Sequence, residues 1–143
     1  MKILEVKTEK RRLGDFGERA AMRLLRKTGY RILEKSYAPE DAEIDIIAEC
    51  KDAIAFIEVK TRNIDAHIRL EPRPASAVTP EKQRGIIGAA RIYLAYHPPK
   101  KHVRFDIIEV YVSGEADKWK VEKANHIKGA FDRDTAQQRR YGR

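Results

Sequence analysis

Two apolar segments, residues 43–49 and 53–61, constrain the fold more than any other part of the chain. Both are rich in isoleucine, alanine, valine and phenylalanine and have the length of strands, and Cys50, Lys51 and Asp52 between them predict a short hairpin turn. Apolar residues occupy both faces of the second predicted strand, which is typical of a strand inside a sheet. This hairpin therefore belongs in a sheet that is covered on both sides.

The other predicted elements follow from helix caps and from hydrophobic spacing. Thr79 and Pro80 are typical of a helix start, and Gly29 lies where the first helical pattern stops. The predicted elements are helices over 11–28 and 80–96 and strands at 30–37, at 103–112 and, as an edge strand, from residue 119. The order helix, three strands, helix, two strands predicts an α/β fold in which helices flank a mixed β-sheet.

Length and composition set the domain organisation and the class of partner. The 143 residues suffice for one domain, over residues 1–125, followed by a basic and flexible tail over 126–143. Lysine and arginine number 30 against 22 aspartate and glutamate residues, and the net charge of +8 favours polyanionic partners such as nucleic acid. Residues 63–78 form a long irregular segment that we expect to face the substrate or to be mobile.

The sequence carries no sign of export or of membrane insertion. Its single cysteine, Cys50, cannot form an internal disulfide, the first residues lack the apolar run of a signal peptide, and no apolar segment has the length of a membrane span. We therefore expect a cytoplasmic protein without a membrane partner.

Charged residues inside the predicted hairpin are the strongest indication of function. Strand alternation places Glu58 and Lys60 on one face, and the position of the turn brings Asp45 opposite Glu58 or within two residues of it. Two carboxylates this close repel unless one is protonated or a cation lies between them, and oxygen ligands of this kind suit Mg²⁺ or Mn²⁺. Lys60 cannot bind a metal while it is charged, but it can stabilise an attacking hydroxide or the charge on a phosphate oxygen.

Simpler interpretations exist for each of these residues. A Glu-x-Lys pair in a strand is most often a structural ion pair. Glu18 lies at the edge of the apolar stripe of the first helix, where it can point toward the strand carboxylates or pair with Arg11 or Arg23 in solvent. Lys82, in the first turn of the second helix, can contact phosphate or lie on the surface. The combination of two carboxylates within apolar strands favours a metal site.

Five ordered blocks between Leu13 and Val112 place these residues in a wider pattern. The blocks are GDFGERAAMRLL, EIDIIAE, FIEVKTR, PEKQRGIIGAARIYL and RFDIIEV. In this order they resemble the YraN-like family of small bacterial proteins, which is similar to archaeal Holliday-junction resolvases of the restriction-endonuclease-like superfamily. Two positions depart from the family pattern, because Ala42 stands where a glycine is usual and Ser36 where an asparagine is usual.

The resemblance implies a restriction-endonuclease-like core and a metal-dependent endonuclease that hydrolyses phosphodiester bonds in branched DNA. The superfamily signature is a helix glutamate, a strand aspartate and a Glu-x-Lys pair. In this sequence the corresponding catalytic residues are Glu18, Asp45, Glu58 and Lys60, and the three carboxylates are the expected ligands of Mg²⁺ or Mn²⁺. Because resolvases act on two strands at once, the resemblance also implies a homodimer, with a helicase or other DNA-processing protein as a further partner.

Basic residues are expected to hold the nucleic acid by its phosphates. The expected contacts are Lys10, Arg11, Arg12, Arg62, Lys82, Lys100 and Lys101, with further basic clusters at residues 23–27 and 139–140. Nothing in the sequence resembles a recognition helix or a set of base-reading side chains. We therefore expect the shape of the nucleic acid to be recognised rather than its sequence.

Two other functions fit the same sequence. One is a non-catalytic nucleic-acid-binding or adaptor domain that keeps the nuclease fold without activity of its own, because a fold does not establish a function. The other is a protein-interaction domain in which Glu40, Asp41, Glu43 and Asp45 form a solvated acidic patch. Metal-dependent strand scission separates the nuclease from the adaptor, and loss of Mn²⁺ binding in Asp45→Asn would exclude the acidic patch.

Overall fold

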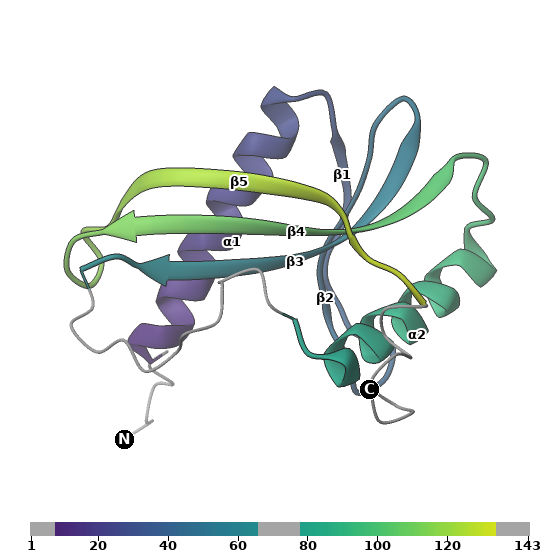
Figure 1. The fold of residues 1–143 in the computed structure, drawn as a ribbon, viewed down its shortest axis with the longest axis horizontal. Helices are drawn as coiled ribbons and strands as arrows, with labels where there is room; N and C mark the ends of the chain where they lie inside the picture. Colours follow the sequence, from purple (N-terminus) through teal and green to yellow (C-terminus); the bar gives the residue numbers. More distant parts are fainter. Residues whose placement is uncertain (1–7, 66–77, 134–143) are drawn as a thin grey trace, which may run out of the picture.

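The computed structural model describes residues 8–65 and 78–133, which form one mixed sheet and two helices (Figure 1). The elements are α1 (Glu9–Lys27), β1 (Arg31–Tyr37), β2 (Ile44–Glu49), β3 (Ala53–Asn63), α2 (Pro80–Tyr96), β4 (His102–Ser113) and β5 (Lys120–Phe131). Their order confirms the α/β fold class predicted from the sequence. Neither of the described helices is long and apolar enough to cross a membrane.

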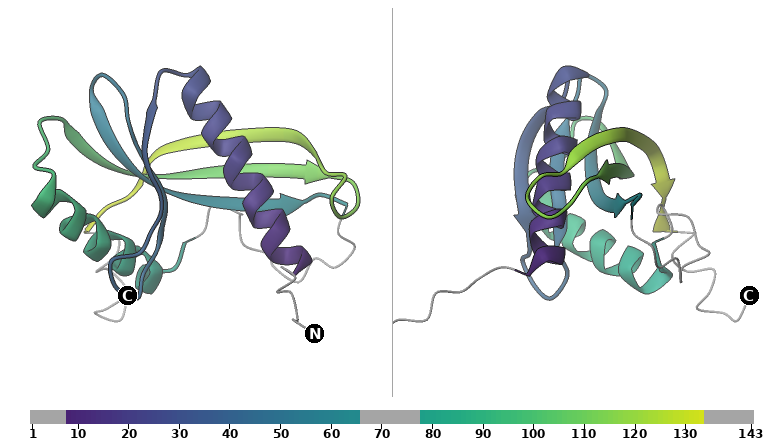
Figure 2. Two further views of the ribbon diagram at one scale, coloured as in Figure 1. Left: turned by 180° about the vertical axis from the view of Figure 1, so that it is seen from behind. Right: turned by 90° about the vertical axis from the view of Figure 1, so that its left-hand side faces the viewer.

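The five strands lie in sequence order across the sheet, β1-β2-β3-β4-β5. β3 and β4 are parallel and are connected through α2, whereas the other neighbouring strands are antiparallel. Helix α1 covers one face of the sheet and α2 covers part of the other face (Figure 2). This arrangement confirms the central position predicted for β3 and the edge position predicted for β5.

Polar caps determine where the two helices begin. Thr8 and Thr79 have extended backbones, and their side-chain oxygens accept hydrogen bonds from the backbone N–H groups of Arg11 and Lys82. Pro80 occupies the first turn of α2, where its missing N–H costs nothing. Because Arg11 and Lys82 line the same cavity, the two caps place the first turns of both helices beside one site.

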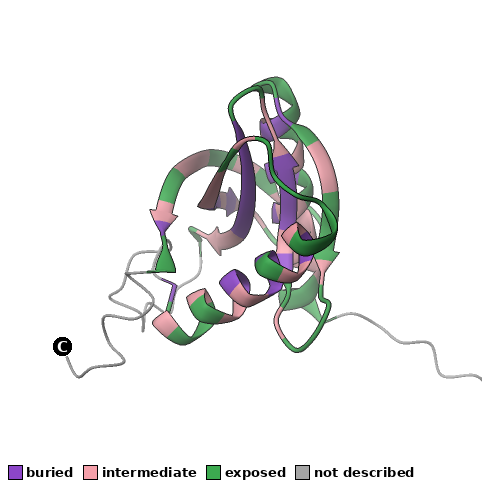
Figure 3. Ribbon diagram, turned by 90° about the vertical axis from the view of Figure 1, so that its right-hand side faces the viewer, coloured by how far each residue is buried: buried purple, intermediate pink, exposed green. Residues whose placement is uncertain are grey.

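Each face of the sheet has its own hydrophobic core. Phe56 of β3 packs with Ile86 beneath α2, whereas Ile57, the next residue, packs with Leu25 beneath α1. Figure 3 shows that the buried residues follow the central strands and the sheet-facing sides of the helices. Burial of each large apolar side chain contributes roughly 1.5–3 kcal/mol. The side chains of β3 thus alternate between the two cores, which holds the strand between two helices and fixes the direction of its charged residues.

Gly17 allows α1 to approach β3 closely. A Cβ atom at this position would lie 1.8 Å from Thr61 Oγ1, which is far inside van der Waals contact. We expect Gly17→Ala to lower the free energy of unfolding by about 2 kcal/mol, because overpacking forces the helix away from the sheet. Urea denaturation measures the loss. Gly14→Ala is the control, since a Cβ there meets nothing within 4 Å, and an equal loss in this variant would contradict close packing at Gly17.

The sheet extends further toward the C-terminus than the sequence predicts. β5 runs to Phe131 and so passes the domain boundary predicted at residue 125 into the segment expected to be a flexible tail. Two long-range contacts hold this part of the strand: Gly129 N–H donates to Asp106 Oδ1 at 2.9 Å, and Phe131 stacks on Phe105 with ring centroids 5.5 Å apart. Residues 66–77 of the segment predicted to face the substrate, over 63–78, and residues 134–143 of the predicted tail lie outside the described residues.

Candidate active site

The candidate site lies where β2 and β3 separate. Their antiparallel pairing ends at Ile46 and Ile57, and the next two residues in this register are Asp45 and Glu58, as the hairpin predicts. Beyond this point β2 turns away from the long strands β3, β4 and β5 (Figure 1). We call this place the β2–β3 fork.

The Asp45 side chain binds across the fork to the backbone of β3. Val59 N–H donates a hydrogen bond to Asp45 Oδ2 at 2.8 Å. The carboxylate thereby satisfies a backbone donor just beyond the end of the strand pairing, and the half-buried side chain is held in a fixed direction.

A cavity of about 850 Å³ opens at the fork and gathers charged side chains of both signs. Its acidic lining residues are Asp15, Glu18, Glu43, Asp45 and Glu58, and its basic lining residues are Lys10, Arg11, Lys60 and Lys82. These residues come from α1, β2, β3, the first turn of α2 and the segment before β2. All four residues with a predicted catalytic role therefore line one cavity.

Glu58 is a buried carboxylate with two lysine partners. Its side chain is 4% exposed, and its Oε2 atom lies 3.5 Å from Lys60 Nζ and 2.6 Å from Lys82 Nζ. Burial lowers the pKa of Lys82, but the hydrogen bond and the charge of Glu58 outweigh this effect and raise the pKa above its ordinary value. Lys82 is therefore charged at neutral pH and compensates the buried carboxylate.

The pKa of Asp45, in contrast, is shifted in favour of its uncharged form. Burial raises the pKa of Asp45 to about 8, and the charges of Glu58 and Glu18 act in the same direction, although the hydrogen bond from Val59 N–H opposes them. Without an additional cation the Asp45 carboxyl group keeps its proton at neutral pH. The fork thus contains a protonated Asp45 beside Glu58, and a cation that enters would favour release of the Asp45 proton.

Glu18 lies on the α1 side of the same cavity. Burial raises the pKa of Glu18, and the charges of Asp15, Glu43 and Glu58 add to this effect. Within residues 8–65 and 78–133, however, no three carboxylate, imidazole or thiol side chains lie close enough together to surround one ion. Glu58 acts on Asp45 both through its charge and through a side-chain contact, whereas Glu18 acts on Asp45 only through its charge, so Asp45 and Glu58 are the closer pair.

The donor set of the fork fits a magnesium or manganese ion. Mg²⁺ keeps several of its waters in proteins and commonly takes only one or two carboxylates as protein ligands. Asp45 and Glu58 supply these two groups, and their oxygen-only chemistry disfavours metals that prefer nitrogen or sulfur. An ion that binds Glu58 Oε2 would replace the Lys82 ammonium group at that atom.

Four of the basic residues expected to bind nucleic acid lie at the fork or next to it. Lys10, Arg11 and Lys82 line the cavity. Arg62 follows Lys60 by two residues on β3 and so lies on the same face of the sheet. The fork therefore has basic side chains beside its acidic ones.

The other three expected contacts lie elsewhere. Arg12 Nε donates to Asp117 Oδ1 at 3.0 Å, in the connection between β4 and β5. Lys100 and Lys101 line a separate cavity near the β2–β3 turn, where Lys101 Nζ lies 3.1 Å from Glu49 Oε1. The structure therefore does not bring Arg12, Lys100 and Lys101 to the fork.

The acidic segment between β1 and β2 is divided between two places. Glu40 and Asp41 are exposed and line a cavity beside α2 together with Arg84, whereas Asp45 lies inside the fork. This separation argues against a single solvated acidic patch.

Ser36, at the end of β1, also lines the fork. Its φ is 51°, a backbone angle that asparagine adopts more readily than serine. This angle gives a physical reason for the asparagine in the family pattern.

Comparison with known proteins identifies the family. The family model described as "Uncharacterised protein family UPF0102" matches residues 17–110, a range that includes all four predicted catalytic residues. A UPF0102 protein of Caldanaerobacter subterraneus subsp. tengcongensis is 44% identical over 126 residues, which cover 87% of this chain and 98% of the relative. UPF0102 proteins of Chlorobium phaeobacteroides and Clostridioides difficile are 42% and 40% identical, over 83% and 82% of this chain and 93% and 95% of the relatives. The chain therefore belongs to the UPF0102 family, the YraN-like family that its sequence blocks resemble.

Proposed function

We propose that the protein is a metal-dependent endonuclease whose hydrolytic centre is the β2–β3 fork. The observation that carries this proposal is the convergence of Asp45 and Glu58 beside Lys60 in one charged cavity. A structural ion pair would account for Glu58 and its lysines. It would not account for Asp45, because its pKa is raised by burial and by a neighbouring carboxylate rather than lowered. Perturbed acids inside a cavity are typical of catalytic and metal-binding sites.

Each residue of the fork would have a separate role in phosphodiester hydrolysis. Asp45 and Glu58 would hold Mg²⁺ or Mn²⁺, and a bound divalent ion supplies positive charge that polarises a phosphate oxygen and acidifies water. Lys60, placed 3.5 Å from Glu58, would neutralise charge that develops on the phosphate. Glu18, on the α1 side of the cavity, would orient a water molecule. By resemblance to the superfamily, we expect products with a 5′-phosphate and a 3′-hydroxyl.

The surroundings of the fork favour a nucleic-acid substrate that is recognised by shape. Lys10, Arg11 and Lys82 line the cavity, and Arg62 continues the positive charge along β3. Side chains of this kind bind phosphates without reading bases. By resemblance to the resolvases, branched DNA would be the substrate class, and a homodimer would be the form in which two strands are cut together.

A non-catalytic nucleic-acid-binding or adaptor domain is the second candidate. The observation that favours it is the pairing of Glu58 with both Lys60 and Lys82, which compensates this carboxylate without a metal. Such a domain would keep the basic surroundings of the fork and bind DNA without cutting it.

A substrate panel separates the two candidates. The wild-type protein is incubated with Mg²⁺, Mn²⁺ or EDTA and with labelled single strands, plain duplex, flapped duplex and a four-way junction. We expect cutting of the branched substrates only when the metal is present. We also expect binding in EDTA to weaken at least about tenfold between about 50 and 200 mM salt, because several phosphates are neutralised. Salt-sensitive binding without scission of any substrate would favour the adaptor.

A further inference from the structure

The sheet face that lies away from α1 changes from apolar to polar beside the fork. Ile107 and Ile127, which are paired between β4 and β5, still belong to the core around α2. The register then gives two polar rows across β3, β4 and β5, namely Lys60–Glu109–Asn125 and Arg62–Tyr111–Lys123. Paired residues of neighbouring strands direct their side chains to the same face. We call these two rows the polar sheet face.

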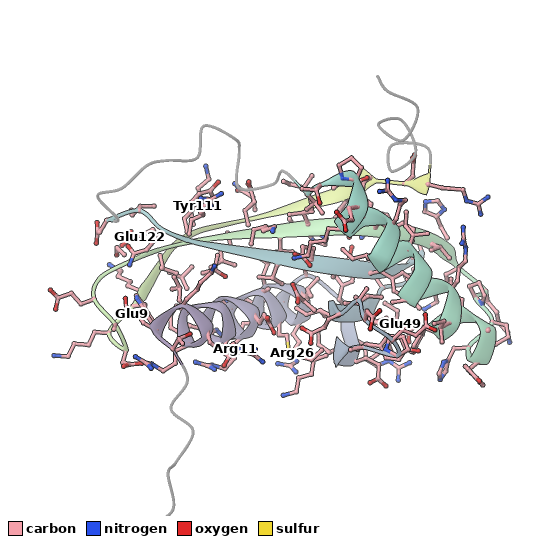
Figure 4. The ribbon with its side chains drawn as sticks, turned by 90° about the horizontal axis from the view of Figure 1, so that it is seen from below. Glu9, Arg11, Arg26, Glu49, Tyr111 and Glu122 are labelled. Carbon is pink, nitrogen blue, oxygen red and sulfur yellow. The ribbon has the colours of Figure 1, made fainter. Side chains whose placement is uncertain are left out.

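Tyr111 lies at the centre of the outer row and is partly exposed. Figure 4 shows its side chain on the side of the sheet away from α1. Two residues before it on the same face lies Glu109, a buried carboxylate that accepts a hydrogen bond from Asn125 Nδ2 at 3.3 Å. Burial and the charge of Glu109 raise the pKa of Tyr111. The Tyr111 hydroxyl group therefore keeps its proton, and Asn125 satisfies one oxygen of the neighbouring Glu109.

Two cationic side chains flank the Tyr111 ring. Arg62 is its partner on β3 and Lys123 its partner on β5, and neighbouring strands lie about 4.8 Å apart. Lys60, in the adjacent row, connects this group directly to the candidate active site. An aromatic ring between cations is the arrangement on which proteins stack the bases of single-stranded nucleic acid while they neutralise its phosphates.

We propose that the polar sheet face binds an unpaired nucleic-acid strand, with one base stacked on Tyr111 and phosphates beside Arg62 and Lys123. The inference rests on the proposed nuclease function and defines its substrate more closely, as branched DNA with a single-stranded arm. The bases of an intact duplex are already stacked and cannot open onto the ring. The simpler interpretation is that this sheet face is only a solvated surface. In that case, removal of the Tyr111 ring would not change the affinity for single strands.

Fluorescence anisotropy of Tyr111→Leu tests this inference. Binding of a labelled single strand, a flapped duplex and a plain duplex is measured in EDTA, so that cleavage does not contribute. Leucine keeps apolar packing on the sheet and removes the ring, and we expect it to weaken binding of the single strand and the flap about tenfold. Binding of the plain duplex should change less than about twofold.

Two further variants sharpen the comparison. Tyr111→Phe keeps the ring and should retain most of the affinity, and Tyr96→Ala removes an exposed tyrosine of α2 that is 78% exposed and should change nothing. The inference is overturned if wild type does not bind single strands, if Tyr111→Leu binds them like wild type, or if it loses duplex binding equally. The nuclease proposal is judged separately, by metal-dependent cutting in wild type, so failure of one is distinguishable from failure of the other.

Discussion

Asp45→Asn is expected to stabilise the metal-free protein at alkaline pH and to weaken its binding of Mn²⁺ at least about tenfold. Burial and the charge of Glu58 raise the pKa of Asp45 to about 8, compared with about 4 in an unfolded chain. The stability that the protonated group contributes is complete below about pH 4 and is lost as the pH rises through about 8, because the native state resists giving up its proton. Asparagine has no charge and retains an oxygen that can accept the hydrogen bond from Val59 N–H. The variant should therefore not lose this stability at high pH.

Urea denaturation in EDTA at pH 5 and pH 9, together with calorimetric titration with Mn²⁺, measures both effects. The unfolding free energy of wild type should fall by about 4 kcal/mol more than that of Asp45→Asn between the two pH values. Asp41→Asn is the matched control, because Asp41 is exposed on the segment before β2 and should affect neither quantity. If Asp45→Asn binds Mn²⁺ as tightly as wild type does, Asp45 is not a metal ligand.

Arg104→Met is expected to cause the largest loss of stability, about 3 kcal/mol at neutral pH. Asp106 is fully buried, and Arg104 Nε donates to its two oxygens at 2.9 and 3.1 Å. His126 Nε2 and Gly129 N–H complete the network, at 2.7 and 2.9 Å. Methionine fills the apolar volume of arginine but leaves the buried carboxylate undercompensated, and breaking a buried ion pair costs roughly 3–5 kcal/mol.

Lowering the pH should reduce the difference in unfolding free energy between wild type and Arg104→Met. Burial by itself raises the pKa of Asp106, but hydrogen bonds from His126, Arg104 and Gly129 together lower it below its ordinary value. The stability that Asp106 contributes is therefore present above about pH 4 and is lost as the pH falls through the lowered pKa. Arg31→Met, which removes an exposed ion pair, is the control and should cost less than about 1 kcal/mol. Equal losses in both variants at pH 7 would contradict the importance of the buried pair.

The part of the site that could be predicted from the sequence depends on local signals. Because the turn at Cys50 to Asp52 is short, counting residues places Asp45 opposite Glu58 or within two residues of it, and the observed pairing of the two strands selects the first of these positions. The start of α2 could likewise be predicted from Thr79 and Pro80. Both predictions required knowledge only of residues near one another in the chain.

The remaining features depend on contacts between distant segments. Lys82 contacts Glu58 only because α2, which connects β3 to β4, brings its first turn to the fork. The sequence did not distinguish this contact from a surface position. Asp106 lies in a segment that reads as an apolar strand, and its partner His126 comes from β5, whose pairing with β4 shifts register nearby. The row that contains Tyr111 likewise depends on the parallel register of β3 and β4, which no hairpin turn determines.

Single-turnover cleavage of a flapped duplex in Mg²⁺ tests most directly whether the β2–β3 fork hydrolyses phosphodiester bonds. The rates of wild type, Asp45→Asn and Lys60→Ala are compared at equal protein concentration, with Asp41→Asn as the control. We predict that wild type and Asp41→Asn cut at the same rate and leave 5′-phosphate ends, while Asp45→Asn and Lys60→Ala are at least about 100-fold slower. Cutting by Asp45→Asn and Lys60→Ala at the wild-type rate would contradict the assignment of the hydrolytic centre to the fork.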